Sequence, residues 1–523
     1  MSKFNKVPAE PTRGSGPITG TAGGHTHEGA PGFIHDVKSE LFLLAVSNMV
    51  GEDTFYEAAG DRDGRYAHLV GTVAVQDPVW LGAFLSWLRN DAHMRSASLV
   101  GALEAAHAMV VAGRPGSRSM VASVLQRADE PGEALAYWLS RHGRAIPKPV
   151  KRGVADAAVR LYNERALLKY DTASHAVRFA DVLELTHPTA GHQVQRDLFR
   201  VALERRHARD TVDLTGLATL RANAELRLAA VDTPEALFDE ERLRAAGMTW
   251  EDVLSLGGAA DLDKAWLWES VIPSMGYMAL LRNLRNFDQA GVSKKVAKAV
   301  ARRLADPDQV ARSRQLPFRF FSAYEQAGSV RWSEALETAL RHSMANLPSL
   351  PGRSLVLIDT SASMTGMHYS ARSTVTPAKA AALFGVALTA KLGADRVDLV
   401  GFADGTFRHA VKPGDSVLRR VEKFLVRTGE VGHGTAIAAS LRSAYAGHDR
   451  VFVISDMQTV DAGTDQAIPE RVPLYGFNLG GYRHTAYAAG RRNRHEFGGL
   501  TDATFRTVPL IEAGRAAHWP WQS

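Results

Sequence analysis

The sequence predicts a mainly α protein in which an array of helix pairs precedes a doubly wound α/β domain. From about residue 33 to residue 344, apolar residues recur at helical spacing between short breaks that contain Gly or Pro. After a connector at residues 347–352, apolar strands alternate with helices, which is typical of βαβ units and a mostly parallel sheet. We therefore divide the chain into an arm (1–31), a helical domain (32–347) and an α/β domain (348–523).

Composition narrows the class of protein. The 523 residues allow roughly two to four domains, and the hydrophobic content of 45% and charged content of 23% are ordinary for a globular protein. No apolar run approaches the ~20 residues of a membrane helix, and the N-terminus lacks the apolar core of a secretory signal, so we expect a cytoplasmic protein. The chain contains no cysteine, which excludes disulfides, thiolate metal sites and cysteine nucleophiles.

The first part of the chain is expected to be an unstructured arm followed by helices. Residues 1–31 are rich in Gly, Pro and Thr and have few apolar side chains, so we expect them to be disordered. The helices that follow show no strict sequence period. This favours an irregular array of HEAT-like helix pairs, in which each pair leaves an apolar face that only its neighbour can cover.

The α/β domain is expected to contain a mostly parallel sheet with helices on both faces. The segment 482–499, with Arg491, Arg492, Arg494 and His495, is expected to be a local elaboration beside the last strand. The expected strands are 354–358, 397–402, 406–411, 450–455 and 472–477, and the expected helices are 377–392, 417–426 and 435–445.

Candidate metal ligands follow two of the buried strands and one loop. The loop Gly-His-Gly before Thr435 presents a hydroxyl at a helix start, and the carboxyl ends of neighbouring strands meet in a doubly wound sheet. Carboxylate and hydroxyl oxygens suit Mg²⁺ or Mn²⁺. The alternative is an ordinary strand-to-turn junction, in which the hydroxyls satisfy backbone groups. The candidate ligands are Asp359, Ser361, Ser363, Thr435 and Asp456.

This order of residues, DxSxS followed by a loop Thr and a strand-end Asp, resembles the metal-ion-dependent adhesion site of von Willebrand factor A domains. The resemblance implies a divalent cation, Mg²⁺ first and Mn²⁺ as the alternative, with one coordination position left for water or a partner's carboxylate. We predict docking and no catalytic residues, because His433 is a loop residue and the chain has no P-loop, GxSxG or HExxH motif. Metal-assisted phosphoesterase activity is the catalytic alternative.

Bulk charge gives little support for nucleic-acid binding. The formal net charge is +6, but residues 351–523 hold 20 Lys and Arg against 15 Asp and Glu, which leaves +1 for residues 1–350. The stretch 141–187 nevertheless combines basic and aromatic residues, which suit phosphate contacts and base stacking. The alternative is a solvated helix face. The candidate RNA contacts are Lys148, Lys151, Arg152, Lys169, Arg178 and His187. A second basic helix face carries Lys294, Lys295, Lys298, Arg302 and Arg303.

Several short stretches resemble the Ro ribonucleoproteins of the bacterial Ro-related type, whose N-terminal part is the TROVE module. They are LYNE at 161–164, KY at 169–170, LTHP at 185–188, MALLRNL at 278–284 and LPF at 316–318, followed by the metal motif. The resemblance implies that the helical repeats close into a ring whose ends the A domain joins. It also implies a monomer that binds Y-like RNA outside and the single-stranded ends of misfolded RNA in the hole.

The resemblance further implies a role in RNA quality control or processing, with a 3′ exoribonuclease as a partner in bacteria. Lys169 and His187 match positions that the family uses for Y RNA, Arg152 sits where the family also has an arginine, and Arg178 is a substitute for an arginine that has no clean counterpart here. The alternative function is a metal-dependent protein-docking scaffold that acts through the A domain and has no RNA role.

Overall fold

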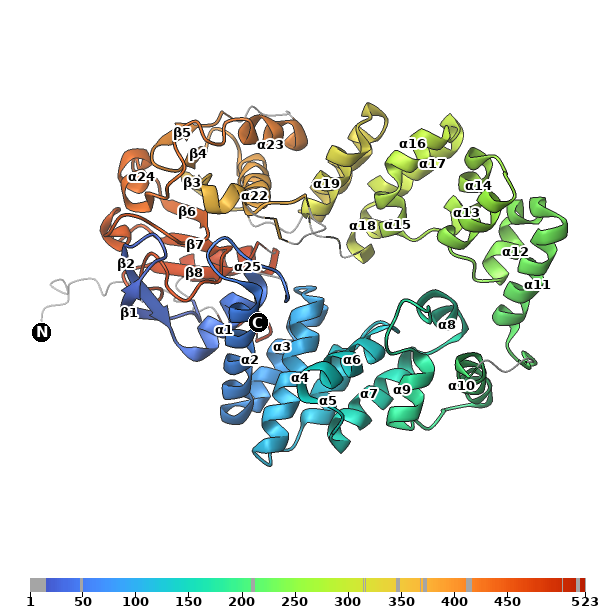
Figure 1. Cartoon of the computed structure of the whole chain (residues 1–523). Helices are drawn as coiled ribbons and strands as arrows, with labels where there is room; N and C mark the ends of the chain where they lie inside the picture. Colours follow the sequence, from blue (N-terminus) through green and yellow to red (C-terminus); the bar gives the residue numbers. More distant parts are fainter. Residues whose placement is uncertain are drawn as a thin grey trace, which may run out of the picture. The chain divides into compact units, whose positions relative to one another are not determined.

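The computed structural model describes two compact units (Figure 1). One, here the sheet unit, combines residues up to Leu69 with residues from Met344 onward, and the other, here the helical unit, spans Val70–Ser343. No helix in the described part of the chain is long and apolar enough to cross a bilayer. The described residues are 16–47, 50–207, 212–313, 315, 317–344, 349–366, 368–369, 374–410, 416–500, 502–513 and 518–522.

The helical unit is a succession of helices in which α4 packs on α3 and α5, and α7 packs on α5 and α9 (Figure 1). A Cβ added to Gly153 of α7 would lie 2.7 Å from the carbonyl oxygen of Arg118 in α5. The two backbones therefore cross at a distance that only Gly permits. The helices are α3 (Pro78–Asn90), α4 (Arg95–Val111), α5 (Ser117–Val124), α6 (Glu130–His142), α7 (Lys148–Leu161), α8 (Glu164–Tyr170), α9 (Phe179–Thr186), α10 (Gln193–Arg206), α11 (Ala218–Asp232), α12 (Glu240–Ala245), α13 (Trp250–Ala259), α14 (Lys264–Val271), α15 (Tyr277–Arg282), α16 (Leu284–Ala290), α17 (Lys294–Ala305), α18 (Pro307–Ser313), α19 (Pro317–Ala327) and α20 (Ser333–Ser343). Helix α2 (Ala59–Gln76) runs across the boundary between the two units.

The sheet unit contains a six-stranded sheet in the order β5-β4-β3-β6-β7-β8. All neighbouring strands are parallel except β5, which pairs with β4 in the antiparallel sense. The strands are β3 (Ser354–Asp359), β4 (Val397–Phe402), β5 (Thr406–Arg408), β6 (Arg450–Ser455), β7 (Leu474–Asn478) and β8 (Arg494–Gly498). The helices of this part are α21 (Ala362–Thr365), α22 (Pro377–Leu392), α23 (Val417–Leu425), α24 (Ile437–Ala444) and α25 (Asp502–Glu512).

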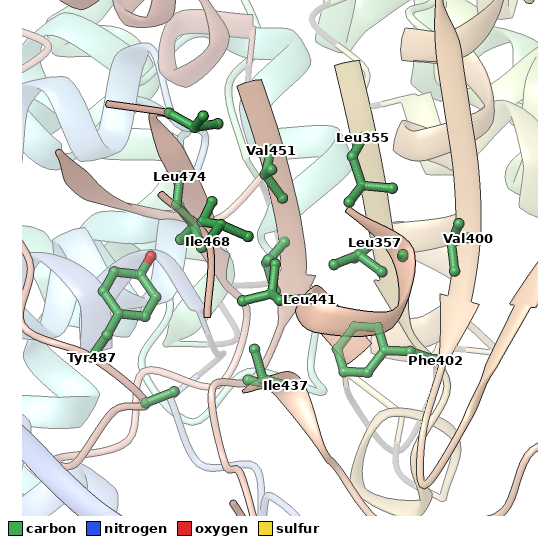
Figure 2. Packing of buried hydrophobic residues seen from close by; sticks show 14 of the residues in the cluster. Leu355, Leu357, Val400, Phe402, Ile437, Leu441, Val451, Ile468, Leu474 and Tyr487 are labelled. Carbon is green, nitrogen blue, oxygen red and sulfur yellow. The ribbon is translucent and has the colours of Figure 1, made fainter. Parts of the chain in front are cut away.

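Helices cover both faces of the sheet. Leu355 and Leu357 of β3 belong to one buried cluster with Leu441 of α24 (Figure 2). Ile358 points to the opposite face and packs on α22. A Cβ added to Gly385 of α22 would lie 2.3 Å from the Cδ1 atom of Ile358. Because alternate residues face opposite sides of a strand, burial on both faces requires consecutive apolar residues, and residues 355–358 of β3 are all apolar. The prediction of a helical array followed by a doubly wound, mostly parallel sheet is confirmed.

The N-terminal arm differs from the sequence-based expectation. Residues 1–15 lie outside the described residues. Strands β1 (Gly20–His25) and β2 (Pro31–His35) form an antiparallel hairpin, so the prediction of disorder is wrong for the hairpin. Three backbone hydrogen bonds fix the hairpin to the rest of the sheet unit. The Gly20 N–H donates to the Ala489 carbonyl (3.1 Å), the Phe33 N–H donates to the Thr485 carbonyl (3.1 Å), and the Thr485 N–H donates to the Phe33 carbonyl (3.0 Å). Helix α1 (Val37–Ser47) then packs on β8.

The expected local elaboration at 482–499 contains β8, a strand of the sheet itself. Arg494 is buried, and its guanidinium donates to the carbonyls of Asp465 (2.7 Å) and Ile468 (2.8 Å). Elsewhere the expected and observed elements agree closely, since α22, β4 and β6 have the expected bounds. The division at residues 31 and 347 stays a prediction of domain structure, whereas the compact units group residues up to Leu69 with the sheet.

Candidate functional site

Two strand-end aspartates lie at the point where the strand order of the sheet reverses. From β3 the chain continues to β4 on one side, whereas β6 lies on the other side, with Ile358 opposite Ile454. Asp359 ends β3, and Asp456 follows directly after β6. In open α/β sheets this switch point leaves a crevice at the carboxyl ends of the strands, where ligands bind.

The DxSxS segment is held in a compact turn by its own carboxylate. One oxygen of Asp359 accepts the backbone N–H of Ser361 at 2.8 Å, and the other accepts the Ser455 hydroxyl at 2.5 Å. The Ser361 and Ser363 hydroxyl oxygens lie 3.2 Å apart. Both are buried, so one carboxylate and two hydroxyls share a small polar region at the end of β3.

The second aspartate keeps one oxygen without a hydrogen-bond partner. Oδ1 of Asp456 accepts the backbone N–H of Gln458 at 3.1 Å, whereas Oδ2 is buried and unpartnered. Burial raises the pKa of Asp456, and the negative charge of Asp359 raises it further. Burial likewise raises the pKa of Asp359. Two buried carboxylates facing each other destabilise their charged forms, and a divalent cation is the chemical group that removes this repulsion.

The loop that carries Thr435 lies against the DxSxS segment. The Ala362 N–H donates to the His433 carbonyl at 2.9 Å, and the Asp404 carboxylate accepts the N–H groups of His433 (2.9 Å) and Gly434 (3.2 Å). Thr435 itself is buried. The structure thus brings the five predicted ligands, Asp359, Ser361, Ser363, Thr435 and Asp456, to one edge of the sheet; they are called the metal-site residues below.

The donor set suits a hard cation. Carboxylate and hydroxyl oxygens are the ligands of Mg²⁺ and Mn²⁺, and Oδ2 of Asp456 is a buried acceptor that such an ion would satisfy. Within the described ranges, no group of three or more His, Asp or Glu side chains is arranged to hold a metal, so the hydroxyls are essential to this set. The residues therefore fit a metal-ion-dependent adhesion site.

The predicted RNA contacts lie in three consecutive helices of the helical unit. Lys148, Lys151 and Arg152 occupy the first turn and a half of α7, whose first turn contains no acidic residue, and Lys148 and Arg152 are exposed. Lys169 is exposed at the end of α8, with its amine 5.1 Å from the centre of the Tyr170 ring. His187 is exposed and forms the left-handed C-cap of α9, with φ of 49°.

Arg178 differs from the other five predicted contacts. Its guanidinium binds the Asp171 carboxylate through Nη2 at 2.7 Å and Nε at 3.3 Å, and Asp171 also accepts the N–H of Phe179 at 3.0 Å. This pair fixes the segment between α8 and α9. Arg178 and His187 stand at opposite ends of α9, about 13 Å apart along the helix, so the structure does not bring all six residues to one point.

On the second basic helix, α17, one arginine serves the fold. Arg303 donates to the carbonyls of Ile272 (3.0 Å) and Met275 (2.8 Å). Lys294, Lys295, Lys298 and Arg302 are exposed. Four of the five predicted cations of this helix face are therefore accessible to solvent or to a partner.

Comparisons with known proteins agree with this architecture. Residues 241–329 match the family model of the TROVE domain. The chain carries a TROVE segment. Its fold matches the crystal structure of the Deinococcus radiodurans RO (RSR) protein with a TM-score of 0.59 and 18% identity, over 91% of this chain and 100% of that chain. The predicted resemblance to the TROVE-domain Ro family is thereby confirmed, and the MALLRNL stretch lies inside the matched segment.

Two curated relatives share a shorter region with this chain. Telomerase protein component 1 of Mus musculus is 38% identical over 103 residues, and its counterpart in Rattus norvegicus is 37% identical over 103 residues. Each match covers 19% of this chain and 4% of the relative's length. The likeness therefore concerns one segment of those proteins.

Sequence reasoning missed several residues around the metal-site residues. Ser455 and Asp404 had a signal, because each lies at or just beyond the end of a predicted strand at the same sheet edge. Gln458 fixes the segment after Asp456 and had no such signal.

Proposed function

We propose that this protein is a noncoding-RNA-binding scaffold of a ribonucleoprotein, in which the helical unit holds the RNA and no catalysis takes place. The TROVE segment and the exposed basic residues of α7 and α8 support the proposal. The RNA classes proposed are a Y-like small RNA on the outer surface and the single-stranded ends of misfolded RNA in the hole of a ring. The setting proposed from the Ro resemblance is RNA quality control or processing by a cytoplasmic monomer, with a 3′ exoribonuclease as a partner.

The start of α7 carries the argument for phosphate binding. The free N–H groups and dipole of a helix N-terminus attract an anion, and Lys148, Lys151 and Arg152 add three positive charges there. Lys169 above Tyr170 offers a cation and an aromatic face together, which suits a phosphate next to a stacked base. Arg178 is assigned a positioning role, because Asp171 already occupies its guanidinium.

The test begins with crosslinking in cells and sequencing of the bound RNA, in which enrichment of small structured RNA is expected. With that RNA, Lys148→Ala combined with Arg152→Ala should lower the magnitude of the salt slope of log Kd by about 2, since two phosphate contacts are lost. Lys264→Ala is the matched control, because Lys264 is also exposed at the first position of a helix, α14. No enriched RNA, or equal slopes for all three proteins, would contradict the proposal.

A second function is favoured by the metal site. We propose that Asp359, Ser361, Ser363, Thr435 and Asp456 hold Mg²⁺, or alternatively Mn²⁺, for docking of an acidic partner. A bound cation of this kind supplies a Lewis-acidic position that a carboxylate can fill. His433 contacts the site through its backbone carbonyl and its side chain is exposed, which gives no support for a general base and hydrolysis.

Docking and RNA binding can be separated by mutation. Asp359→Ala should abolish capture of a protein partner while the affinity for RNA stays unchanged, because the RNA candidates lie in the other unit. Pull-down of the full chain in Mg²⁺ and in EDTA measures the first effect, and RNA filter binding measures the second. An unchanged set of protein partners in Asp359→Ala would reject the docking role and leave the RNA proposal standing.

A further inference from the structure

The part of the helical unit that contains α11 to α14 combines exposed apolar side chains with an excess of acids (Figure 1). We propose that this part docks an arginine-rich segment of a protein partner, with Trp266 as the anchor. The residues at its centre are called the Trp266 surface below, and they are Glu235, Phe238, Asp263 and Trp266. None of them is a candidate RNA contact or metal ligand, so the inference goes beyond RNA binding and metal-dependent docking.

Trp266 offers a large aromatic face to solvent. Its side chain, on α14, is 65% exposed. Its ring meets the half-buried ring of Phe238 edge to face, with centroids 5.7 Å apart. Phe238 ends the 3-10 helix η1 (Pro234–Phe238), which packs on both α11 and α14, and α11 exposes Leu228 and Val231 on one side. An exposed tryptophan that a second ring already holds in place is the kind of residue that anchors a protein interface.

Two carboxylates border the aromatic pair. Asp263 caps α14, and its Oδ1 atom accepts the backbone N–H of Trp266 at 2.9 Å. Glu235 precedes Phe238 by three residues in η1, and side chains three residues apart in a 3-10 helix lie on the same face. Both acids are exposed. A ligand that covers the two rings therefore meets negative charge at their edge.

The whole segment around the Trp266 surface is acidic. Residues 225–269 contain 11 Asp and Glu against 4 Lys and Arg, a net charge of −7, whereas the rest of the chain carries +13. Two of the four bases are bound to acids of the same segment, since Arg227 pairs with Asp252 and Arg244 pairs with Glu240. Two bases then remain against nine acids. A surface with this balance attracts cations and repels the phosphates of a nucleic acid.

These features together select arginine. A guanidinium stacks on an indole face and at the same time donates hydrogen bonds to a carboxylate, which the Trp266 ring and the Asp263 carboxylate offer side by side. The ammonium of lysine carries the same charge but lacks the planar face that stacks. An arginine-rich segment supplies several such cations. Apolar side chains in the same segment can cover Leu228 and Val231.

The main test measures binding of fluorescein-labelled octa-arginine to the full chain by fluorescence anisotropy. Trp266→Ala should weaken binding about tenfold or more, and Trp266→Phe should recover part of the loss, because a phenyl ring binds cations less strongly than an indole. Asp263→Asn, which keeps the helix cap, combined with Glu235→Gln should weaken binding about fivefold and lower its salt dependence.

Two controls change the same residue types elsewhere on the helical unit. Val330→Ala removes a side chain that is 83% exposed, and Asp308→Asn removes an exposed acid. Both variants should bind octa-arginine as the wild type does. Equal affinity of Trp266→Ala and the wild type for octa-arginine would overturn the proposal.

Three further measurements decide which kind of partner the Trp266 surface takes. Octa-lysine should bind the wild type about threefold or more weakly than octa-arginine, and oligouridylate should bind the wild type and Trp266→Ala alike. Oligouridylate binding that depends on Trp266 would assign the surface to RNA. Self-association in analytical ultracentrifugation that Trp266→Ala abolishes would assign it to a second copy of this chain. Either result would overturn the arginine-rich partner and leave the metal site and the basic residues of α7 as proposed.

Discussion

The substitution Asp456→Asn should have opposite effects on stability in the absence and presence of metal. In the metal-free protein, the carboxylate of Asp456 is buried with an unpartnered oxygen close to the negative charge of Asp359. An asparagine keeps the acceptor for the Gln458 N–H and turns an N–H donor toward the place of the unpartnered oxygen. We expect the metal-free variant to be more stable than the wild type by about 1–3 kcal/mol, because the neutral amide replaces a buried carboxylate that has an unpartnered oxygen beside Asp359.

Added metal should reverse this order. A ligand at 100 times its Kd stabilises the folded state by about 2.7 kcal/mol, which corresponds to a Tm increase of about 5–10 °C for a unit of this size. The wild type should show this increase with Mg²⁺, whereas Asp456→Asn should not, because the site has lost one of its two charges. The expected result is a crossing of the two stabilities between EDTA and Mg²⁺.

Calorimetry of the full chain can measure this crossing. The relevant transition is the one that responds to Mg²⁺, since two units need not unfold as one. Asp395→Asn is the control for the loss of an acid elsewhere in the sheet unit. A variant that is less stable than the wild type in EDTA and gains as much from Mg²⁺ would refute the assignment of Asp456 as a metal ligand.

Three further predictions concern pairs outside the metal site. Burial lowers the pKa of His35, but the Glu496 carboxylate 2.8 Å away outweighs it and raises the pKa above 6.5. The stabilisation from the protonated pair is complete below pH 6.5 and is lost as the pH rises through the folded pKa. The Tm between pH 6 and 8 should therefore depend less on pH in His35→Gln than in the wild type. Glu130 is buried and accepts from Arg89 and Arg95, so Glu130→Ala should cost about 3–5 kcal/mol in urea unfolding. Arg178→Ala should weaken RNA binding without changing the salt slope, whereas Lys169→Ala should lower the magnitude of the slope by about 1.

The elements that the sequence predicted best are those whose pattern and ends can be read from the local sequence. Strands β3 and β6 are covered by helices on both faces, and their centres are continuous apolar runs at residues 355–358 and 451–454. Strand β4 has one acid, Asp398, in an otherwise nonpolar run. Helix α22 begins at Pro377 after the side-chain cap of Thr376 and ends at Leu392 before the C-cap Gly393, and these signals are local in the sequence. The metal-site residues follow from these strand ends and needed no further information.

The elements that were missed depend on contacts between distant residues. Strand β8 is fully buried although it contains Arg494, His495 and Glu496, a pattern that excludes a buried strand when read alone. Glu496 is satisfied by His35 of the hairpin (2.8 Å) and by Asn478 of β7 (2.8 Å). The hairpin in turn is Gly-rich and is ordered by its bonds to the sheet unit. Neither β8 nor the β1–β2 hairpin can be predicted from its own sequence, because each is stabilised by contacts with the other.

The same reasoning explains the different status of Arg178. The basic stretch was read from its cations, but Asp171 lies only seven residues before Arg178 and pairs with it once α8 and α9 bring them together. An acid within the stretch removes one of the six candidates from direct contact with phosphate. The remaining five lie at or near the ends of helices, and Lys148, Arg152, Lys169 and His187 are exposed there.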